Sequence, residues 1–347
     1  MSIFSYFRAE KASDDAGSDQ DVLDIQRLLD HTTRISLDDS CSINNDTAQS
    51  HAFANAPLFS IAAQSVAEKL SRRGSINSRL IPQYGLIGRR EGLDETALTP
   101  EDQLIMANLN IPWSAFICDS QGSGKSHTLS CLLEACLIQD NPTAKLSHSM
   151  TGMVFHFDTF TSGSATQICE AAYLASSGIP VKVLVPPSNI WSMDRPYNCH
   201  LGTIEDCPNL EVVPLYLDDS KLNVSTLLKL MAFDPNRSVT PLYMEVVMRI
   251  IREVTMEGSP FTYSLFRSRL AKTKLLPGQQ TPLQMRLQLL KSFLTPELTP
   301  HMRKPSVAEQ DIWDFQPGSL TIVDLSDPFL SSDDACGLFS ICLSIFL

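Results

Sequence analysis

The chain has 347 residues, of which 43% are hydrophobic and 19% are charged, and this composition excludes collagen-like and coiled-coil proteins. Its length is enough for one large domain or two ordinary ones. The formal net charge is −12, and half of it lies in residues 1–50, which hold ten acidic and four basic residues. A chain this acidic is a poor candidate for broad electrostatic binding to nucleic acid or to an anionic membrane.

The cysteines and the apolar runs indicate in which cellular compartment the protein is expected. The nine cysteines form no CxxC pair, and several lie in apolar runs where a thiol packs as a small hydrophobic group. The N-terminus lacks the apolar core of a signal peptide, and no uncharged apolar run reaches the length of a membrane span. We therefore expect an intracellular protein, cytoplasmic or nuclear, without a signal peptide or a transmembrane segment.

Two regions of different texture follow one another along the chain. Residues 1–80 are acidic and rich in Ser, Asp, Asn and Ala, so we expect a disordered tail with one weak helical candidate at 22–29. From residue 81, short apolar runs alternate with longer periodic segments, which is typical of an α/β domain. We expect this domain to occupy residues 81–347, with a largely parallel sheet flanked by helices.

The predicted elements of that domain follow in chain order. Apolar runs predict five strands, and helical spacing predicts three helices around them and an all-helical insertion at about 222–295. Pro and Gly residues, among them those at 277, 278 and 282, are expected to separate the helices of the insertion. The strands are expected at 114–118, 153–157, 181–185, 210–217 and 319–323; the helices at 125–139, 165–177 and 333–347; and those of the insertion at 227–233, 242–256, 263–270 and 283–294.

The strongest chemical pattern is Asp119-Ser-Gln-Gly-Ser-Gly-Lys-Ser126, between a predicted strand and a predicted helix. In a phosphate-binding loop (Walker A), glycines let backbone N–H groups turn toward a phosphate, the lysine reaches the β and γ phosphates, and the last serine holds Mg²⁺. We therefore predict ATP as the cofactor, with Mg²⁺ held by Ser126. The predicted nucleotide-binding residues are Ser120, Gln121, Gly122, Ser123, Gly124, Lys125, Ser126 and His127.

One position departs from the pattern. Asp119 stands where GxxxxGK[ST] has its first glycine, and a carboxylate beside a polyphosphate is unfavourable unless it points away or binds the metal through water. We expect nucleotide binding to be weakened for this reason.

The acidic residue that supports Mg²⁺ during ATP hydrolysis is harder to find in the sequence than the phosphate-binding loop. ATP hydrolysis also needs an Asp at a strand end to support Mg²⁺, usually next to a Glu. Two predicted strands end in an acid, at Asp158 and Asp324, but neither acid is followed by Glu. Each of the two can also serve as a helix cap or a turn residue, and this alternative is stronger for Asp158 than for Asp324. The sequence therefore leaves open whether ATP is hydrolysed, and it assigns no catalytic residue.

A family resemblance covers about residues 82–347, and it is carried by four segments, at residues 116–130, 154–158, 241–246 and 320–326. They resemble a group of fungal P-loop ATPases, which are in turn similar to the HerA and FtsK superfamily of hexameric DNA-pumping ATPases. The resemblance implies a P-loop NTPase fold, assembly into a homo-oligomeric ring, and a Walker B strand with Asp-Glu beyond Leu347. Asp324 would then not be the Mg²⁺ acid.

Other functions stay open beside this one. The first is a nucleotide-dependent interaction or scaffold protein that does not hydrolyse ATP. The second is a small-molecule kinase, which would need an arginine-rich lid. The charge outside residues 1–50 neither excludes nor supports nucleic acid as a partner. Candidate residues with an ordinary structural alternative are Arg195, Arg249 and Arg252 acting on a neighbouring subunit; Arg267, Arg269 and Arg286 as lid residues; Cys199, His200 and Cys207 as metal ligands; and His156 in its apolar strand.

Overall fold

The computed structural model describes most of the chain after residue 52, and it divides into two compact units. One unit takes in residues 1–116 and 143–146, and the other residues 117–142 and 147–347. No helix within the described ranges is both long and apolar enough to cross a bilayer. The described residues are 53–65, 81–90, 103–118, 120, 122–139, 141–159, 167–200, 208–217, 222–231, 242–258, 261–294 and 311–347.

The first unit is a small antiparallel sheet in the order β1-β3-β2-β4. Asn108, at the end of β3, is fully buried, and its side-chain amide donates to the carbonyls of Ala54 and Ala56, which ties the start of the unit to the sheet. A cluster of Phe53, Phe59, Ile81 and Met106 forms its core. The strands are β1 (Leu58–Ser60), β2 (Tyr84–Arg89), β3 (Leu104–Asn108) and β4 (Ala144–Lys145).

Two sequence expectations fail in this part of the chain. Residues 53–65 fall in the expected disordered tail, yet they form β1 and bury Phe53 and Phe59, because aromatic pairs supply enough apolar surface for a small core. The buried strand predicted at 114–118 is also wrong. These residues are irregular and exposed, with Phe116 91% exposed, since no neighbouring strand among the described residues pairs with them. The helix expected at 22–29 lies outside the described residues.

The second unit contains the predicted α/β architecture. Its four strands are all parallel, in the order β5-β8-β6-β7. Because both faces of a parallel sheet are covered, its strands read as continuous apolar runs, and this is why the sequence located all four. They are β5 (Gly152–His156), β6 (Val181–Val185), β7 (Leu210–Pro214) and β8 (Leu320–Asp324).

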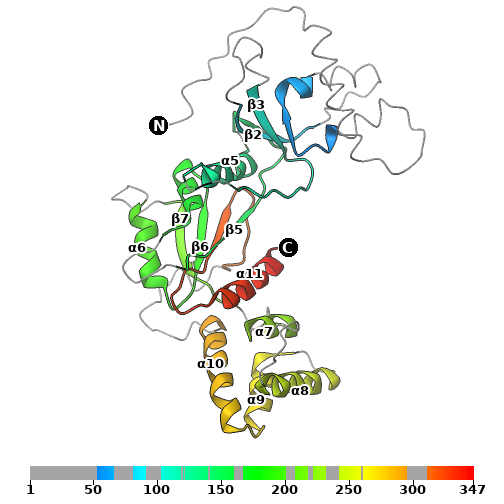
Figure 1. Ribbon diagram of the computed structural model, residues 1–347, viewed down its shortest axis with the longest axis vertical. Helices are drawn as coiled ribbons and strands as arrows, with labels where there is room; N and C mark the ends of the chain where they lie inside the picture. Colours follow the sequence, from blue (N-terminus) through cyan, green and yellow to red (C-terminus); the bar gives the residue numbers. More distant parts are fainter. Residues whose placement is uncertain are drawn as a thin grey trace, which may run out of the picture. The chain divides into compact units, whose positions relative to one another are not determined.

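Helices lie on both faces of this sheet. On one face, alternate side chains such as Val183 and Ile322 pack with α5 (Lys125–Leu137), the 3₁₀ helix η2 (Glu170–Ser177) and α6 (Ile190–His200), which lies beside β7 in Figure 1. A helix was predicted for 165–177; residues 167–169 are irregular, and Glu170–Ser177 form a 3₁₀ helix that ends at Gly178 in the left-handed conformation.

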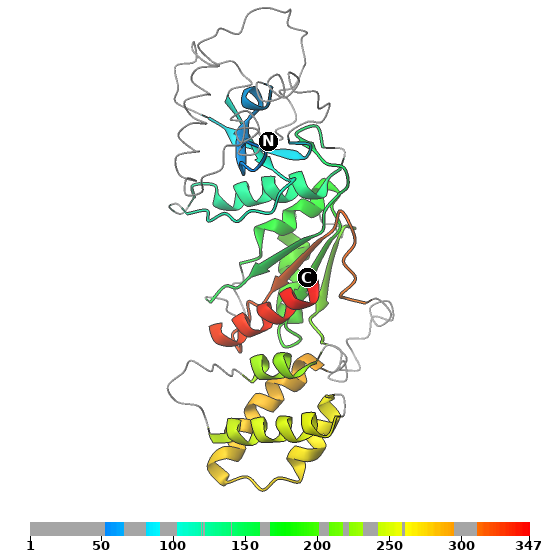
Figure 2. The same cartoon turned by 90° about the vertical axis from the view of Figure 1, so that its right-hand side faces the viewer.

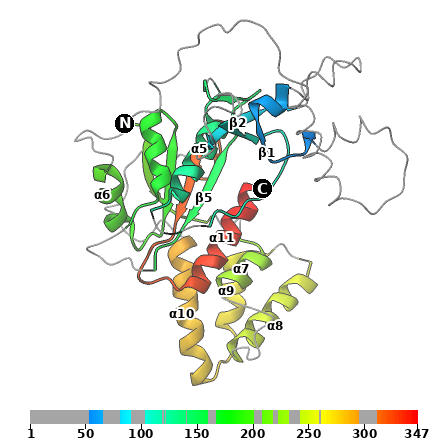
Figure 3. The ribbon, with the colours of Figure 1, turned by 45° about the horizontal axis from the view of Figure 1, so that its top comes forward.

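The other face packs against α11 (Ser332–Phe346) and the helical insertion. Figure 2 shows α11 between the sheet and the insertion, and the rings of Phe155 and Phe339 meet there with centroids 4.9 Å apart. A capping box of Ser331 and Asp334 begins α11. Figure 3 shows the four helices of the insertion gathered beyond α11. They are α7 (Val224–Leu230), α8 (Leu242–Met256), α9 (Tyr263–Ala271) and α10 (Pro277–Leu294).

The last of these helices begins earlier than the sequence predicted. Pro277, Gly278 and Pro282 were expected to separate helices, but α10 begins at Pro277 and runs through the other two. Proline is well placed in a first turn because its missing N–H has no intrahelical partner there. Pro282 stands in the second turn and removes one helical hydrogen bond, to the carbonyl of Gly278.

Candidate functional site

The glycine-rich loop leads directly into α5. Gly122 has φ 83° and Gly124 has φ 94°, a left-handed backbone that glycine adopts without strain. Gly124 is the N-cap of α5, and as a glycine it supplies no side-chain cap to this end of the helix. A Cβ at either glycine would meet nothing within 4 Å, so the backbone conformation alone explains the two glycines.

The first turn of α5 presents hydrogen-bond donors. The first helical bond runs from the N–H of Thr128 to the carbonyl of Gly124 at 2.9 Å, which leaves the N–H groups of residues 125–127 without an intrahelical acceptor. The Nζ of Lys125 donates to the carbonyl of Ser120 at 2.6 Å. Backbone donors, the positive end of the helix dipole and an ammonium group therefore lie together at one exposed helix end.

The other predicted loop residues are placed as follows. Gly122, Ser123, Gly124, Ser126 and His127 are exposed, and the Nε2 of His127 lies 3.7 Å from the Sγ of Cys131, one turn along the helix. Asp119 and Gln121 lie outside the described residues. The structure thus brings the described members of the predicted set together in one loop and helix turn.

The loop differs from the predicted strand-loop-helix arrangement in how it meets the sheet. The carboxyl-terminal half of α5 packs against β5: a Cβ on Gly152 would lie 3.5 Å from the side chain of Leu137 and 3.6 Å from that of Leu133. The residues of α5 that are buried are Ala135 and Leu137. The amino-terminal half of α5 and the loop before it are therefore held mainly by local geometry.

A second polar group of residues lies where β5 and β8 end. Asp324 is completely buried, and both of its carboxylate oxygens are engaged. The Tyr197 hydroxyl donates to Oδ2 at 2.5 Å, and the Ser326 N–H donates to Oδ1 at 3.0 Å. The Nδ1 of His156 lies 3.1 Å from the same Oδ1. We call Asp324, His156, Tyr197 and Ser326 the carboxyl-end cluster.

Further bonds tie this cluster to the elements around it. The Ser326 hydroxyl accepts from the N–H of Asp158 at 2.8 Å, and its carbonyl accepts from the Asn189 amide at 2.7 Å. The Tyr197 hydroxyl also accepts from the N–H of Cys169 at 3.1 Å. The cluster therefore joins β5, β8, α6 and the segment before η2, at the edge of a parallel sheet where α/β proteins commonly bind ligands.

Burial and the Asp324 charge shift the pKa values of the cluster. For Tyr197, burial first and then the charge and hydrogen bond of Asp324 raise the pKa far above its usual value of 10.0. For His156, burial alone lowers the pKa, but the hydrogen bond and charge of Asp324, helped by Asp158 and Glu170, raise it above 6.5 overall. The His156 side chain is 23% exposed, so it can exchange a proton with solvent.

This geometry decides between two interpretations of Asp324. Its oxygens accept from Tyr197, His156 and the backbone two residues later, which is the bonding of a buried turn residue. With its oxygens engaged by these donors, Asp324 is not poised as the Mg²⁺ ligand of a phosphate site. The sequence analysis did not identify Tyr197 or Ser326 as members of this cluster. The spacing of Asp324 and Ser326, two residues apart, is the pattern that could have indicated the turn between them.

The candidate arginines do not converge on one site. Arg249 pairs with Glu253 at 3.8 Å on its own helix, and Arg269 pairs with Glu257 at 2.6 Å. Arg286 pairs with Asp334 on α11. Arg195 and Arg252 are exposed. The ion pairs of Arg269 and Arg286 argue against the arginine-rich lid of a kinase.

No metal cluster is found among the residues that the structure describes. Cys207 lies outside the described residues, as do the side chains of Cys199 and His200. The metal site considered for these three residues therefore stays a prediction.

Comparison with known proteins does not assign this chain to a family. No protein-family model matches this chain, and neither the curated proteins nor the solved structures give a match. The function proposed next therefore depends on the geometry of the chain itself.

Proposed function

We propose that the glycine-rich loop binds the phosphates of a nucleoside triphosphate, with ATP as the first candidate. The observation that carries this proposal is the exposed start of α5, where two left-handed glycines precede the helix and the Nζ of Lys125 turns back to the loop carbonyl of Ser120. An anion there would accept from the N–H groups of residues 125–127 and would interact favourably with the helix dipole. The Nζ of Lys125 would exchange the Ser120 carbonyl for a phosphate oxygen.

The residues of this turn fit a magnesium nucleotide. Ser126 is the second residue of α5 and is exposed, so its hydroxyl is the group that would hold Mg²⁺. The ion would neutralise phosphate charge. The proposal covers binding and not hydrolysis, because Asp324 is engaged within the carboxyl-end cluster. Ring assembly and contact with nucleic acid, which the family resemblance implies, stay predictions.

The test is ATP affinity measured by isothermal titration calorimetry on the full chain, with and without Mg²⁺. Lys125→Ala should weaken binding at least about tenfold, because a charge-assisted hydrogen bond contributes about 1.5–3 kcal/mol. Its stability should change by less than about 0.5 kcal/mol, since Lys125 lies on an exposed turn.

The matched control is Lys274→Ala, which removes an exposed lysine in the turn between α9 and α10. This variant should bind ATP like the unaltered protein. Equal affinity in the two variants, or no ATP binding by the unaltered chain, would contradict the proposal.

A further inference from the structure

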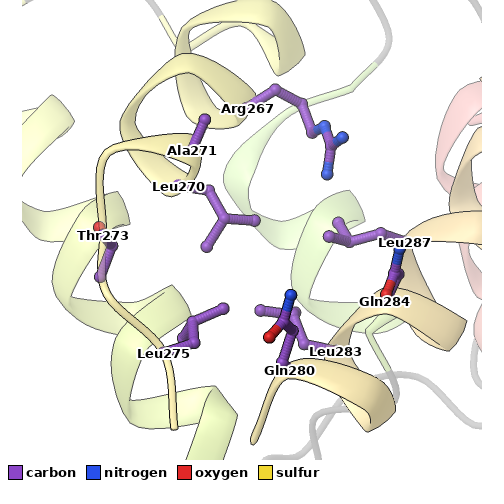
Figure 4. Close-up of a pocket in the computed structure, with 9 residues that line it drawn as sticks. All are labelled: Arg267, Leu270, Ala271, Thr273, Leu275, Gln280, Leu283, Gln284 and Leu287. Atoms are coloured by element: carbon purple, nitrogen blue, oxygen red, sulfur yellow. The ribbon is translucent and has the colours of Figure 1, made fainter. Parts of the chain in front are cut away.

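A pocket in the helical insertion lies between α9 and α10. Its volume is about 290 Å³, and it is bounded by the end of α9, the turn that follows and the first turns of α10. Figure 4 shows its leucine side chains pointing toward one another across the gap between the two helices. The lining residues are Arg267, Leu270, Ala271, Thr273, Leu275, Gln280, Leu283, Gln284 and Leu287.

The pocket has an apolar floor and a polar rim. Leu270, Leu283 and Leu287 are buried and belong to the main core of the unit. Gln280 and Gln284 are exposed at the rim of the same helix face, one turn apart. Arg267 is exposed on the facing helix, and its guanidinium points into the opening in Figure 4.

The surrounding segment is basic in an otherwise acidic protein. Residues 261–294 contain six Lys and Arg residues and no Asp or Glu, although the whole chain carries −12. Arg269 and Arg286 are paired with carboxylates from other helices. Among the described residues no hydrogen bond or ion pair is found for Arg267, and this cation stands at the mouth of a leucine-lined pocket.

We propose that this pocket binds a small amphipathic carboxylate, with the carboxylate on Arg267 and the apolar part over the leucine floor. A guanidinium binds a carboxylate through two parallel hydrogen bonds, and the amide groups of Gln280 and Gln284 can donate from the opposite wall. This inference is independent of the proposed nucleotide site, which lies on α5.

The size of the pocket indicates the size of the ligand. Small-molecule pockets commonly measure about 300–1,000 Å³, and this pocket falls at the lower end of that range. A single unbranched chain of medium length fits such a volume better than a folded partner surface does. Lys272 and Lys274, in the turn beside the pocket, add positive potential that favours an anion.

The test uses sodium octanoate as the probe and the full chain as the protein. Octanoate labelled with ¹³C at its carboxyl carbon is titrated by NMR, and octyltrimethylammonium bromide serves as a cation of matched chain length. Octanoate should bind saturably and the cation should not. Arg267→Gln should weaken octanoate binding about tenfold or more, since it removes the charge-assisted bonds.

Two more variants separate the pocket from general charge and from misfolding. Arg252→Gln removes an exposed arginine from α8, outside the pocket, and should bind octanoate unchanged. Ala271→Phe fills the pocket from an exposed position and should abolish binding at an unaltered melting temperature. If Ala271→Phe does not fold, Arg267→Gln decides alone. The inference is overturned if octanoate does not bind, if the cation binds as well, or if Arg252→Gln and Arg267→Gln lose affinity equally.

Discussion

The glycine-rich loop and the carboxyl-end cluster are opposite in how they are built. The loop is a strong sequence pattern whose described residues are mostly exposed and held by local geometry. The cluster is weak in sequence, because its members lie far apart: Tyr197 is 127 positions from Asp324, and His156 is 170 positions from Ser326. The difference teaches that a local pattern can place a loop without fixing what it contacts, whereas the cluster satisfies its own polar groups through contacts between distant segments.

The largest expected effect is on stability, from Asp324→Ala. This change leaves the Tyr197 hydroxyl, the His156 ring and the Ser326 N–H without their shared acceptor in a buried site. Removing one partner of a buried charged network costs about 3–5 kcal/mol. Urea unfolding of the full chain, followed by circular dichroism, measures the loss.

Two companion variants sharpen this result. Asp314→Ala removes an exposed aspartate near the start of β8 and should cost less than about 0.5 kcal/mol. Asp324→Asn keeps the shape and one acceptor oxygen, so its cost should fall between those of the two alanine variants. If Asp324→Ala is as stable as Asp314→Ala, the cluster does not stabilise the sheet edge and the comparison with the loop fails.

A smaller loss is expected from Tyr197→Phe. The substitution keeps the ring packed in α6 but removes a hydroxyl that donates to Asp324 and accepts from the N–H of Cys169. Leaving buried partners unsatisfied costs about 1–3 kcal/mol. The same urea experiment measures this change, with Tyr173→Phe as control because Tyr173 is 45% exposed. Equal stability of the two variants would contradict a structural role for the Tyr197 hydroxyl.

The sequence predicted what depends on short-range pattern. The four strands of the parallel sheet are buried on both faces, so each is an uninterrupted apolar run, and the α/β fold with a parallel sheet flanked by helices was predicted correctly. The start of α5 after Gly124 could be located from the sequence, because the spacing of the glycines is a local pattern. Its ligand is a proposal, since nothing in the fold itself tests nucleotide binding.

What the sequence could not predict depends on which segments meet. Residues 114–118 have the apolar character of a strand, yet a strand also needs a neighbour, and a single sequence does not name it. Tyr197 lies in a polar helix that contains a proline, and nothing local marks it as the partner of Asp324. Likewise, the sequence does not show that Arg286 pairs with Asp334 whereas Arg267 lines the pocket. That difference depends on how α9, α10 and α11 pack against one another.

The smallest expected effect is a pH dependence carried by His156. Its pKa is raised above 6.5 in the folded protein, so the folded state binds its proton more tightly than the unfolded chain does. This contribution to stability is fully present below pH 6.5, and it is lost as the pH rises through the folded-state pKa. His156→Gln keeps a neutral donor near Asp324 but cannot take up the proton. The difference in unfolding free energy between the unaltered protein and His156→Gln should therefore be larger at pH 5.5 than at pH 8.5, as measured by urea unfolding at both values. A difference for His156→Gln that is constant across this range would mean that the Asp324 charge is not coupled to the His156 proton.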